Sequence, residues 1–566
     1  MSDITAVTKD APELDAAAAH SAKAGANDVD LQRDEHNEED DRTADDTEQG
    51  ELPQDSKEAN TEGGKVRTLL SVLRKFVGVK DLASQRFSLP ANLLHPQANL
   101  DYWCYFDRPD FFAVIPEMED PLDRMLAVVR YGFSKELKFY DGKIVKPFNS
   151  ILGEHFRCHW QLAIPVLDPQ QGGLVPVEGL RVDKPKSLPL PSLTVPEDRA
   201  AVTPAMSRNA SRESSPPAKG LARFIGGKRS GTTSAGGAIS PARDSAGPSQ
   251  PALEALLNGT ALVSSTSGER TERRIVQLVE QTSHHPPVSC YYVSTDNVEA
   301  YGVDQLAARF TGSSVKIGPG AFAKGIFIKL KEGAKGGSVG EEYQATHATA
   351  SINGLLRGSL WLSVADQSYI TCRGGSRPGL RMRAIIEYKE ESWVGKAKYA
   401  LTGIIYEYDP AAFESEGEGS IMERHKKIAD VAPENIKVHI NGCWKGMITY
   451  KLTSAPESEP ARTLIDLSEL AVLPKQVRPL EEHEPLESRR VWRNVIEAIH
   501  AKNFSRATKE KQIVEQRQRD EAAERKKAGT EYYPQFFEKE YQNGRPTLTA
   551  KGREVVESML KAGTSA

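Results

Sequence analysis

Residues 280–289 read EQTSHHPPVS, and this decapeptide carries more information than any other stretch of the chain. It follows RIVQLV at 274–279 and leads into CYYV at 290–293, and both flanks have the β-branched and aromatic content of strands. We therefore expect His284 and His285 where a strand ends. Pro286 and Pro287 fix φ and bias His285 toward an extended backbone. Two adjacent imidazoles in this setting can donate hydrogen bonds to an anion such as a phosphate.

Chemistry alone leaves two interpretations of the histidine pair open: an anion site, or a structural pair at a strand end. A metal site is not favoured, because the five cysteines form no Cys-x-x-Cys pair and no His-Glu-x-x-His occurs. We expect no metal and no cofactor.

The decapeptide resembles the signature of the oxysterol-binding-protein family, Glu-Gln-Val-Ser-His-His-Pro-Pro, with Thr282 in place of the Val. Three further segments resemble the same family in the same order: KPFNSILGE at 146–154, PLESRRVW at 485–492 and KQIVEQRQR at 511–519. Ser150 stands where the family's first motif has a Pro. Together the segments cover roughly residues 65–165 and 271–540.

The resemblance implies an α+β fold: a large, near-closed antiparallel β-barrel that encloses a lipid tunnel, with an N-terminal amphipathic lid and C-terminal helices. The domain would span 65–566, with the lid at about 65–95, the barrel to about 475 and a helical region at about 476–566. We expect a short form that has only the lipid-binding domain.

Composition sets two segments apart from this domain. Residues 1–64 carry 19 Asp and Glu against 5 Lys and Arg, a net charge of −14, and we expect an acidic disordered tail. Because the whole chain has a net charge of −5, the remaining residues carry +9, which suits contact with anionic lipid. Residues of about 183–270 are rich in Ser, Pro, Gly, Ala and Thr and have no core-forming period, so we expect a disordered insertion.

Hydrophobic periodicity predicts the main elements. Residues 65–77 place Leu69, Leu73 and Phe76 on one face of a cationic amphipathic helix, which either packs on the core or lies on a membrane. Residues 125–129 read as a buried helix. Many short strands are expected between about 273 and 455, which favours an antiparallel barrel or sandwich, and helices are expected from 485 to about 528.

Residues 511, 515 and 519 recur every four positions, so all three project from one face of the C-terminal helix. Taken alone, they would be an ordinary ladder of ion pairs. The resemblance implies instead that they hold the headgroup of phosphatidylinositol 4-phosphate together with the two other motifs. The implied headgroup residues are Lys146, Asn149, His284, His285, Lys511, Glu515 and Arg519.

The second ligand is a sterol or phosphatidylserine. Asp101 and Tyr102 resemble the lid-base region of sterol-carrying relatives, although an uncharged Gln is expected at the first position. The segment GEHFRC at 153–158 resembles the phosphatidylserine-carrying subgroup instead. We favour the sterol.

The function implied is non-vesicular transfer of one lipid in exchange for phosphatidylinositol 4-phosphate; the alternative is a lipid sensor that signals through the state of its lid. We predict no catalytic residues, since no Gly-x-Ser-x-Gly elbow occurs, and no nucleic-acid partner, since no recognition motif occurs. We expect a cytoplasmic monomer that touches anionic membranes transiently, at contact sites of the endoplasmic reticulum, Golgi or plasma membrane.

Overall fold

The computed structural model describes residues 61–79, 81–82, 89–140, 144–165, 270–376, 378–391, 398–411 and 424–562. The acidic segment 1–64, except for its last four residues, and the insertion at 183–270, except for Arg270, lie outside the described residues.

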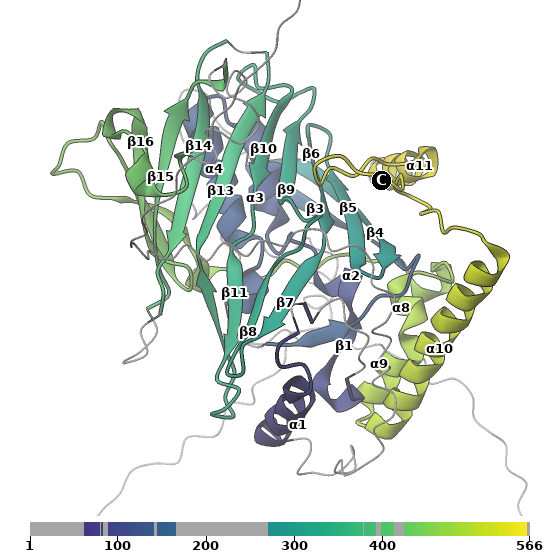
Figure 1. The fold of residues 1–566 in the computed structure, drawn as a ribbon. Helices are drawn as coiled ribbons and strands as arrows, with labels where there is room; N and C mark the ends of the chain where they lie inside the picture. The colour runs from purple at the N-terminus through teal and green to yellow at the C-terminus, as the bar shows by residue number, and fades with distance from the viewer. Residues whose placement is uncertain are drawn as a thin grey trace, which may run out of the picture. The chain divides into compact units, whose positions relative to one another are not determined.

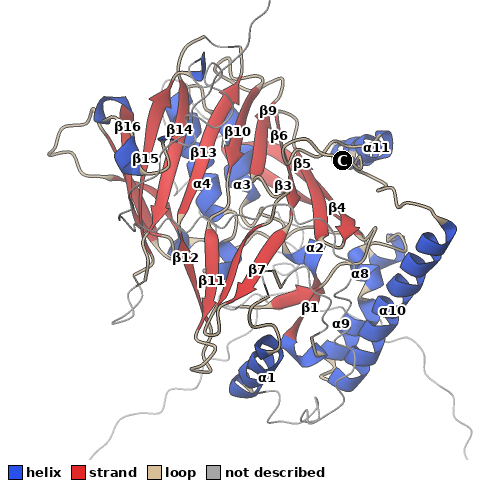
Figure 2. Cartoon of the chain, in the orientation of Figure 1, coloured by secondary structure: helices blue, strands red, loops and turns tan. Residues whose placement is uncertain are grey.

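A sheet of twelve strands dominates the described part of the chain (Figures 1 and 2). Its order is β18-β17-β16-β15-β14-β13-β10-β9-β6-β5-β4-β3, and every neighbouring pair is antiparallel. The strands are β3 (His155–Pro165), β4 (Arg270–His284), β5 (Pro287–Ser294), β6 (Val298–Asp304), β9 (Ile326–Leu330), β10 (Glu341–Ala345), β13 (Gln367–Gly374), β14 (Arg381–Tyr388), β15 (Ala400–Tyr408), β16 (Ile436–Cys443), β17 (Met447–Leu452) and β18 (Arg462–Asp466).

Strand pairing leaves the twelve-stranded sheet open, because β18 and β3 are its two edges. The chain that follows β18 runs back along β3: the backbones of His159 and Gln476 exchange two hydrogen bonds of 2.9 and 2.8 Å, and the His155 amide donates to the Leu486 carbonyl over 3.0 Å. An irregular segment therefore covers the edge of β3 that a closed barrel would pair with a strand.

A second sheet continues four central strands of the first. Its strands are β7 (Leu306–Phe310), β8 (Val315–Pro319), β11 (Thr349–Asn353) and β12 (Trp361–Ala365). They directly extend β6, β9, β10 and β13 beyond short breaks, and their order β12-β11-β8-β7 repeats the order β13-β10-β9-β6. This extension sheet, as we call these four strands, lies beyond the ends of the larger sheet (Figure 1).

The helices and the remaining short strands complete the described chain. They are α1 (Glu62–Arg74), β1 (Leu94–Ala98), α2 (Asn99–Tyr102), α3 (Pro109–Ala113), α4 (Pro121–Ser134), β2 (Lys146–Phe148), α8 (Ser488–Val491), α9 (Arg493–His500), α10 (Phe504–Ala528) and α11 (Ala550–Lys561). Strands β1 and β2 form a parallel pair.

The main core lies between one face of the large sheet and helices α3 and α4. Residues 125–129 of α4 are fully buried, which confirms the buried helix expected there. The Arg124 guanidinium is buried with them and reaches β10, where it donates to both oxygens of Glu341 at 2.9 and 3.1 Å. A buried charge needs such a partner. Helix α4 is thereby fixed to the sheet by packing and by one ion pair.

The expected α+β class is confirmed, with a large antiparallel sheet, an N-terminal helix and C-terminal helices. The sheet is not closed into the near-closed barrel that was expected, because β18 and β3 remain edge strands. No helix in the described ranges is both long enough and apolar enough to span a bilayer.

Candidate functional site

The first motif, at 146–154, lies beside the histidine signature. The Gly153 amide donates to the Gln281 carbonyl over 3.0 Å, and the Gln281 amide donates to the Glu154 carbonyl over 2.8 Å. Gly153 has φ +79°, and a Cβ there would lie 2.8 Å from the Tyr532 hydroxyl. Only glycine fits this turn without strain. Two motifs far apart in the sequence are thus joined through their backbones.

Glu154 connects the motif at 146–154 to the motif at 485–492, which we call the third motif. Its buried carboxylate accepts hydrogen bonds from the Ser488 hydroxyl (2.7 Å), the Trp492 indole (3.0 Å) and the Ile151 amide (3.0 Å). Burial raises the pKa of Glu154 to about 7, although these hydrogen bonds oppose the rise. The residue is an acceptor that holds the loop at 149–154 against α8.

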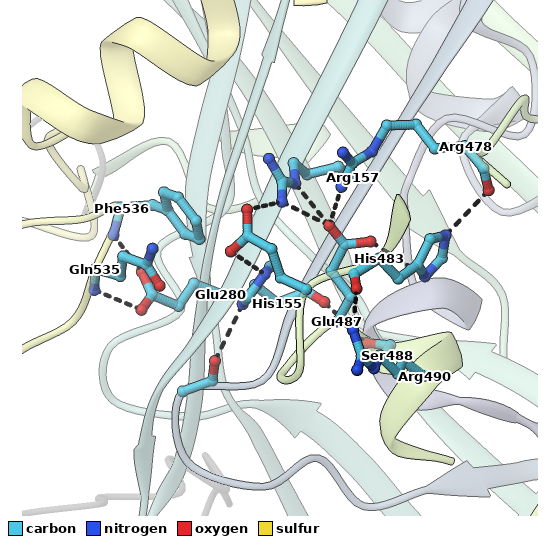
Figure 3. Close-up of polar contacts among 12 residues, drawn as sticks. His155, Arg157, Glu280, Arg478, His483, Glu487, Ser488, Arg490, Gln535 and Phe536 are labelled. Atoms are coloured by element: carbon cyan, nitrogen blue, oxygen red, sulfur yellow. Dashed lines mark hydrogen bonds and ion pairs between the residues drawn. The ribbon is translucent and has the colours of Figure 1, made fainter. Parts of the chain in front are cut away.

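Glu280, the first residue of the histidine signature, ties β4 to the C-terminal segment (Figure 3). Its carboxylate accepts from the backbone amides of Gln535 (2.6 Å) and Phe536 (2.8 Å) and from the Tyr532 hydroxyl (3.2 Å). Burial raises the pKa of Glu280 above its ordinary value. We call the contacts made by Glu154 and Glu280 the motif junction.

Helix α10 brings Lys511 to Lys146. Helices α9 and α10 pack on β1 and β2 through an apolar cluster that includes Phe148, Trp492 and Ala507. Lys511 is buried, and its ammonium lies 2.8 Å from Glu515. Desolvation and the nearby charge of Lys511 lower the pKa of Lys146 to about 8. The Lys146 side chain itself is exposed at the start of β2.

The histidine pair follows directly after the junction. His284 ends β4 three residues beyond Gln281, and the rings of His284 and His285 meet edge to face with centroids 4.5 Å apart. Asn149 is exposed on the loop that carries Glu154. The expected position of the pair at a strand end is confirmed.

Arg519 lies about two turns beyond Lys511 on α10. Its guanidinium donates to the Gln516 side chain at 3.2 and 3.1 Å. The structure thus brings Lys146, Lys511 and Glu515 together, joins their loop to the histidine strand, and places Arg519 further along the same helix.

Asp101 is held in ion pairs. The Arg489 guanidinium lies 2.8 Å from one carboxylate oxygen, and the Lys475 ammonium lies 3.2 Å from the other. Burial would raise the pKa of Asp101, but these two charges outweigh it and hold the pKa far below its ordinary value. The two cations account for an Asp where an uncharged Gln was expected, and this carboxylate links α2 to the third motif.

Tyr102 belongs to an aromatic group at the same place. Its ring contacts Trp103 edge to face at 5.5 Å and Phe139 at 6.2 Å, and the Lys138 ammonium lies 5.4 Å from its centroid. Burial raises the pKa of Tyr102 to about 12, so its hydroxyl stays protonated. It is thereby available as a hydrogen-bond donor.

Leu69, Leu73 and Phe76 of the N-terminal helical segment all belong to one apolar cluster, together with Phe310 and Leu355 of the extension sheet and its turns. The predicted helix is present as α1, and its apolar face packs on the extension sheet.

The structure brings together a polar group at Tyr105 that the sequence did not reveal. The Tyr105 hydroxyl donates to Asp304 over 2.9 Å, and burial raises the pKa of Asp304 to about 6. The His347 ring lies 5.1 Å from the Tyr105 ring, centroid to centroid and tilted by 36°, and burial lowers the pKa of His347 to about 3. Asp304 and His347 both keep accessible surface although protein surrounds them. The available signal was Asp304, an acid at the end of β6, directly after the buried Val303.

His155, Glu484 and Glu487 have ligand atoms within 4.8 Å of one another, as a metal site requires. Two guanidiniums already neutralise this cluster (Figure 3): Arg157 contacts both carboxylates, and Arg478 contacts Glu487. The arrangement fits an ion-pair network that joins β3 to the third motif.

The family profile described as "Oxysterol-binding protein" matches residues 68–168 and 266–557. This chain belongs to the oxysterol-binding-protein family. It is 37% identical over 507 residues to oxysterol-binding protein-like protein 1 of Schizosaccharomyces pombe, a match that covers 88% of this chain and 92% of the yeast protein.

Two other relatives are longer than the region they share with this chain. Oxysterol-binding protein homolog 6 of Saccharomyces cerevisiae is 27% identical over 260 residues, which covers 46% of this chain and 50% of that protein. Human oxysterol-binding protein-related protein 9 is 22% identical over 491 residues, which covers 85% of this chain and 49% of the human protein.

The fold is similar to that of solved family members. The ORD domain of Osh1 in complex with cholesterol matches with a TM-score of 0.51 at 15% identity, covering 87% of this chain and 89% of that domain. The same domain in complex with ergosterol matches with a TM-score of 0.50. At this identity the likeness concerns the fold, and the chain is a lipid-binding member of its family on the strength of the family match.

Proposed function

We propose that this protein extracts phosphatidylinositol 4-phosphate from one membrane, carries a sterol in the opposite direction, and so exchanges the two lipids without vesicles. The proposed carrier unit is residues 65–566, with the tail at 1–64 and the insertion at about 183–270 outside it. Transfer would take place in the cytoplasm, between the endoplasmic reticulum and the Golgi or plasma membrane.

The observation that carries this proposal is the approach of Lys146 and Lys511. Two ammonium groups repel one another, and desolvation together with the charge of Lys511 lowers the pKa of Lys146. A polyanion bound between them would remove both penalties. An inositol phosphate is such an anion, and Lys recognises phosphate as a point charge.

The neighbouring groups suit an inositol ring. The imidazoles of His284 and His285 and the amide of Asn149 supply directional donors, while Glu515 can accept from ring hydroxyls or orient Lys511. Arg519 would add a charge further along α10. We propose all seven residues as the headgroup site, with Glu154 and Glu280 as the groups that hold their supporting segments in place.

The polar group of Tyr105, Asp304 and Tyr291 suits the single hydroxyl of a sterol. Asp304 can accept a hydrogen bond there, and the Tyr291 hydroxyl has no hydrogen-bond partner among the described residues while its ring lies 5.7 Å from that of Tyr105. A sterol hydroxyl can donate to the carboxylate and accept from the phenol. The solved Osh1 domain of similar fold holds cholesterol and ergosterol, which agrees with this choice over phosphatidylserine.

Lipid transfer also requires that the protein cover the apolar part of the bound lipid. Burial is worth about 0.8 kcal/mol per CH₂, so moving a chain of ~16 carbons into water costs on the order of 13 kcal/mol. A protein that covers this surface removes the barrier without making or breaking a bond, and no catalytic residue is required.

The test is transfer between two populations of liposomes. Sterol is placed in one population and phosphatidylinositol 4-phosphate in the other, and both lipids are followed with fluorescent probes. We expect sterol transfer to accelerate when phosphatidylinositol 4-phosphate is present in the acceptor vesicles.

Each alternative has its own result in this assay. Binding of both lipids without appreciable transfer would overturn the transfer function in favour of a sensor. Extraction of phosphatidylserine but not of sterol would overturn the choice of second ligand.

A further inference from the structure

A separate apolar cluster lies on the face of the large sheet that is turned away from the main core. Ile385 and Ile404 belong to this outer cluster, whereas their neighbours Ile386 and Ile405 belong to the main core, because side chains alternate between the two faces of a strand. Residues 424–430, which we call the strap, pack on the outer cluster. Figure 1 shows β14, β15 and β16 on the side of the sheet away from α10.

Hydrogen bonds from β14 hold the strap at two points. Near its start, the Arg383 guanidinium donates to the His425 carbonyl over 2.9 Å. Three residues further on, the Ile428 amide donates to the Glu387 carboxylate over 2.9 Å. Both bonds involve the backbone of the strap, so they fix its path against the sheet.

An open recess of about 510 Å³ lies beside the strap. Its floor is formed by β15 and β16, where Thr402 pairs with Asn441 and Ile404 pairs with His439. The strap forms a wall of the recess and contributes Lys427 to the lining. A cavity of this size accommodates a ligand of several residues or a small organic molecule.

The lining of the recess contains two lysines, one histidine and one acid. The acid, Glu387, is already engaged, because it accepts from the Ile428 amide and lies 3.3 Å from the Lys389 ammonium. Lys427 and His439 are exposed to solvent. Two lysines against one glutamate give the lining a formal charge of +1 when His439 is neutral.

A buried cation beneath the strap adds to this charge. Arg383 is 1% exposed, and besides the His425 carbonyl its guanidinium contacts the hydroxyls of Thr371 (3.2 Å) and Tyr406 (2.9 Å). All three partners are neutral, so they satisfy the hydrogen bonds of the guanidinium but leave its charge in place. A buried charge without an opposite charge beside it favours an anion nearby.

The surroundings of the recess contain acids as well as cations. The strap adds Arg424, Lys426 and Asp430, and Glu390 lies next to the lining. The Asp430 carboxylate accepts from the Lys427 amide over 2.7 Å. Five cations, with the buried arginine included, thus stand against three acids, and two of those acids already accept hydrogen bonds from backbone amides. The field at the recess is therefore positive.

We propose that the recess beside the strap binds an acidic segment of a partner protein. Lys389 and Lys427 contact the carboxylates of this segment at the rim, as in other sites where basic side chains recognise acidic motifs. Thr402, His439 and Asn441 donate hydrogen bonds to it from the floor.

The concave shape favours a peptide over a membrane or a single small anion. A flat bilayer would reach the two lysines at the rim but not the floor at Ile404, which is buried. A lone phosphate ion would occupy only a small part of the recess. A short extended segment can contact both the rim and the floor.

The proposal goes beyond lipid exchange. Docking at this recess uses none of the seven residues proposed for the headgroup, and the recess lies on a different part of the sheet. A protein docked there would determine where in the cell the carrier works without occupying its lipid site.

The experiment measures binding of a fluorescein-labelled octaglutamate peptide to the full-length protein by fluorescence anisotropy. Lys427→Glu reverses a charge at the rim. Lys329→Glu is the matched control, because Lys329 is exposed in β9 of the same sheet and does not line the recess. We expect Lys427→Glu to weaken the affinity about fivefold and Lys329→Glu to change it by less than about twofold.

A second variant tests the shape of the recess without altering the charge. Ala429 lines the recess and is exposed, so Ala429→Trp should fill part of it without disturbing the core. We expect the affinity for octaglutamate to fall about fivefold, with an unaltered urea midpoint.

Four outcomes would overturn the proposal: no binding of octaglutamate, equal losses for Lys427→Glu and Lys329→Glu, unchanged binding by Ala429→Trp, or competition by inorganic phosphate that is as strong as competition by unlabelled octaglutamate. If Lys427→Glu weakened sedimentation with phosphatidylserine vesicles but not peptide binding, the surface would belong to a membrane instead. Exchange between liposomes separates this proposal from the proposed function. We expect all three variants to exchange lipids normally, and failure of exchange by the unaltered protein would count against the exchange function alone.

Discussion

The motif junction and the lid unit are stabilised in opposite ways. At the junction, buried carboxylates accept several short hydrogen bonds each, and they join segments from both ends of the chain. In the lid unit, by which we mean α1, residues 81–82 and the extension sheet, four buried apolar residues, one backbone hydrogen bond and one hydrogen bond to the Asp81 carboxylate support a helix whose surroundings are exposed. Regions with few buried apolar contacts and much exposed surface open locally more readily than regions with many buried hydrogen bonds. We therefore expect the motif junction to persist and the lid unit to open first.

The difference separates two kinds of residue within one signature. In EQTSHHPPVS, Glu280 faces the C-terminal segment and is buried, while His284 and His285 lie at the strand end. A specific motif therefore combines an anchor with the residues it positions, and substitutions within it should have separate effects on stability and on binding.

The largest effect should follow loss of an anchor. Glu280→Ala leaves the buried amides of Gln535 and Phe536 without their acceptor, and we expect the free energy of unfolding to fall by about 2–4 kcal/mol. Urea denaturation followed by circular dichroism measures this. Glu521→Ala, on the exposed face of α10, is the matched control and should change stability by less than about 0.5 kcal/mol. Equal effects of the two substitutions would remove the anchor role.

Leu73→Ala should have a smaller and local effect. Truncation of a buried Leu costs about 2–5 kcal/mol where the surroundings are rigid, but here the loss should appear as opening of α1 alone. Hydrogen exchange should accelerate within 63–76 while the urea midpoint stays unchanged. Val128→Ala, in the main core, should instead lower the midpoint. A fall in the midpoint for Leu73→Ala equal to that for Val128→Ala would mean that α1 unfolds only with the whole domain.

The smallest effect should be a pH dependence of binding. Lys146, with its pKa lowered to about 8, loses its charge as pH rises through 8, whereas the phosphate it would bind favours the charged form. Above pH 8, binding must therefore take up a proton, and affinity for phosphatidylinositol 4-phosphate should fall by up to about tenfold per pH unit. Lys146→Arg stays charged and should flatten the profile between pH 7.5 and 9. A profile that is the same for both proteins would exclude Lys146 from the site.

The sequence predicted the strands of the large sheet and the C-terminal helices better than it predicted the extension sheet. Strand-like composition predicted many short strands between about 273 and 455, and the structure has strands β4 to β17 in this part of the chain. The helix expected from 485 to 528 is present as α8, α9 and α10. Local pattern was sufficient there because each element buries one face.

The extension sheet was not predicted as a separate layer. Its strands continue those of the large sheet after breaks as short as one residue, as at Gln305 and Asp366, and no local signal marks where hydrogen bonding passes from one sheet to the other. The ion pairs of Asp101 with Arg489 and Lys475 were equally hidden, because partners hundreds of residues apart leave no spacing pattern in one sequence. The sequence alone predicts only that Asp101 belongs to the sterol and lid region, and this stays a prediction.

The proposed headgroup site rests on the histidine pair more than on any other group, and extraction of phosphatidylinositol 4-phosphate from liposomes by the His284→Ala/His285→Ala variant tests it most directly. The account predicts that the folded variant, with an unaltered urea midpoint, loses extraction of this lipid while it still takes up sterol. Extraction at the level of the unaltered protein would contradict the account.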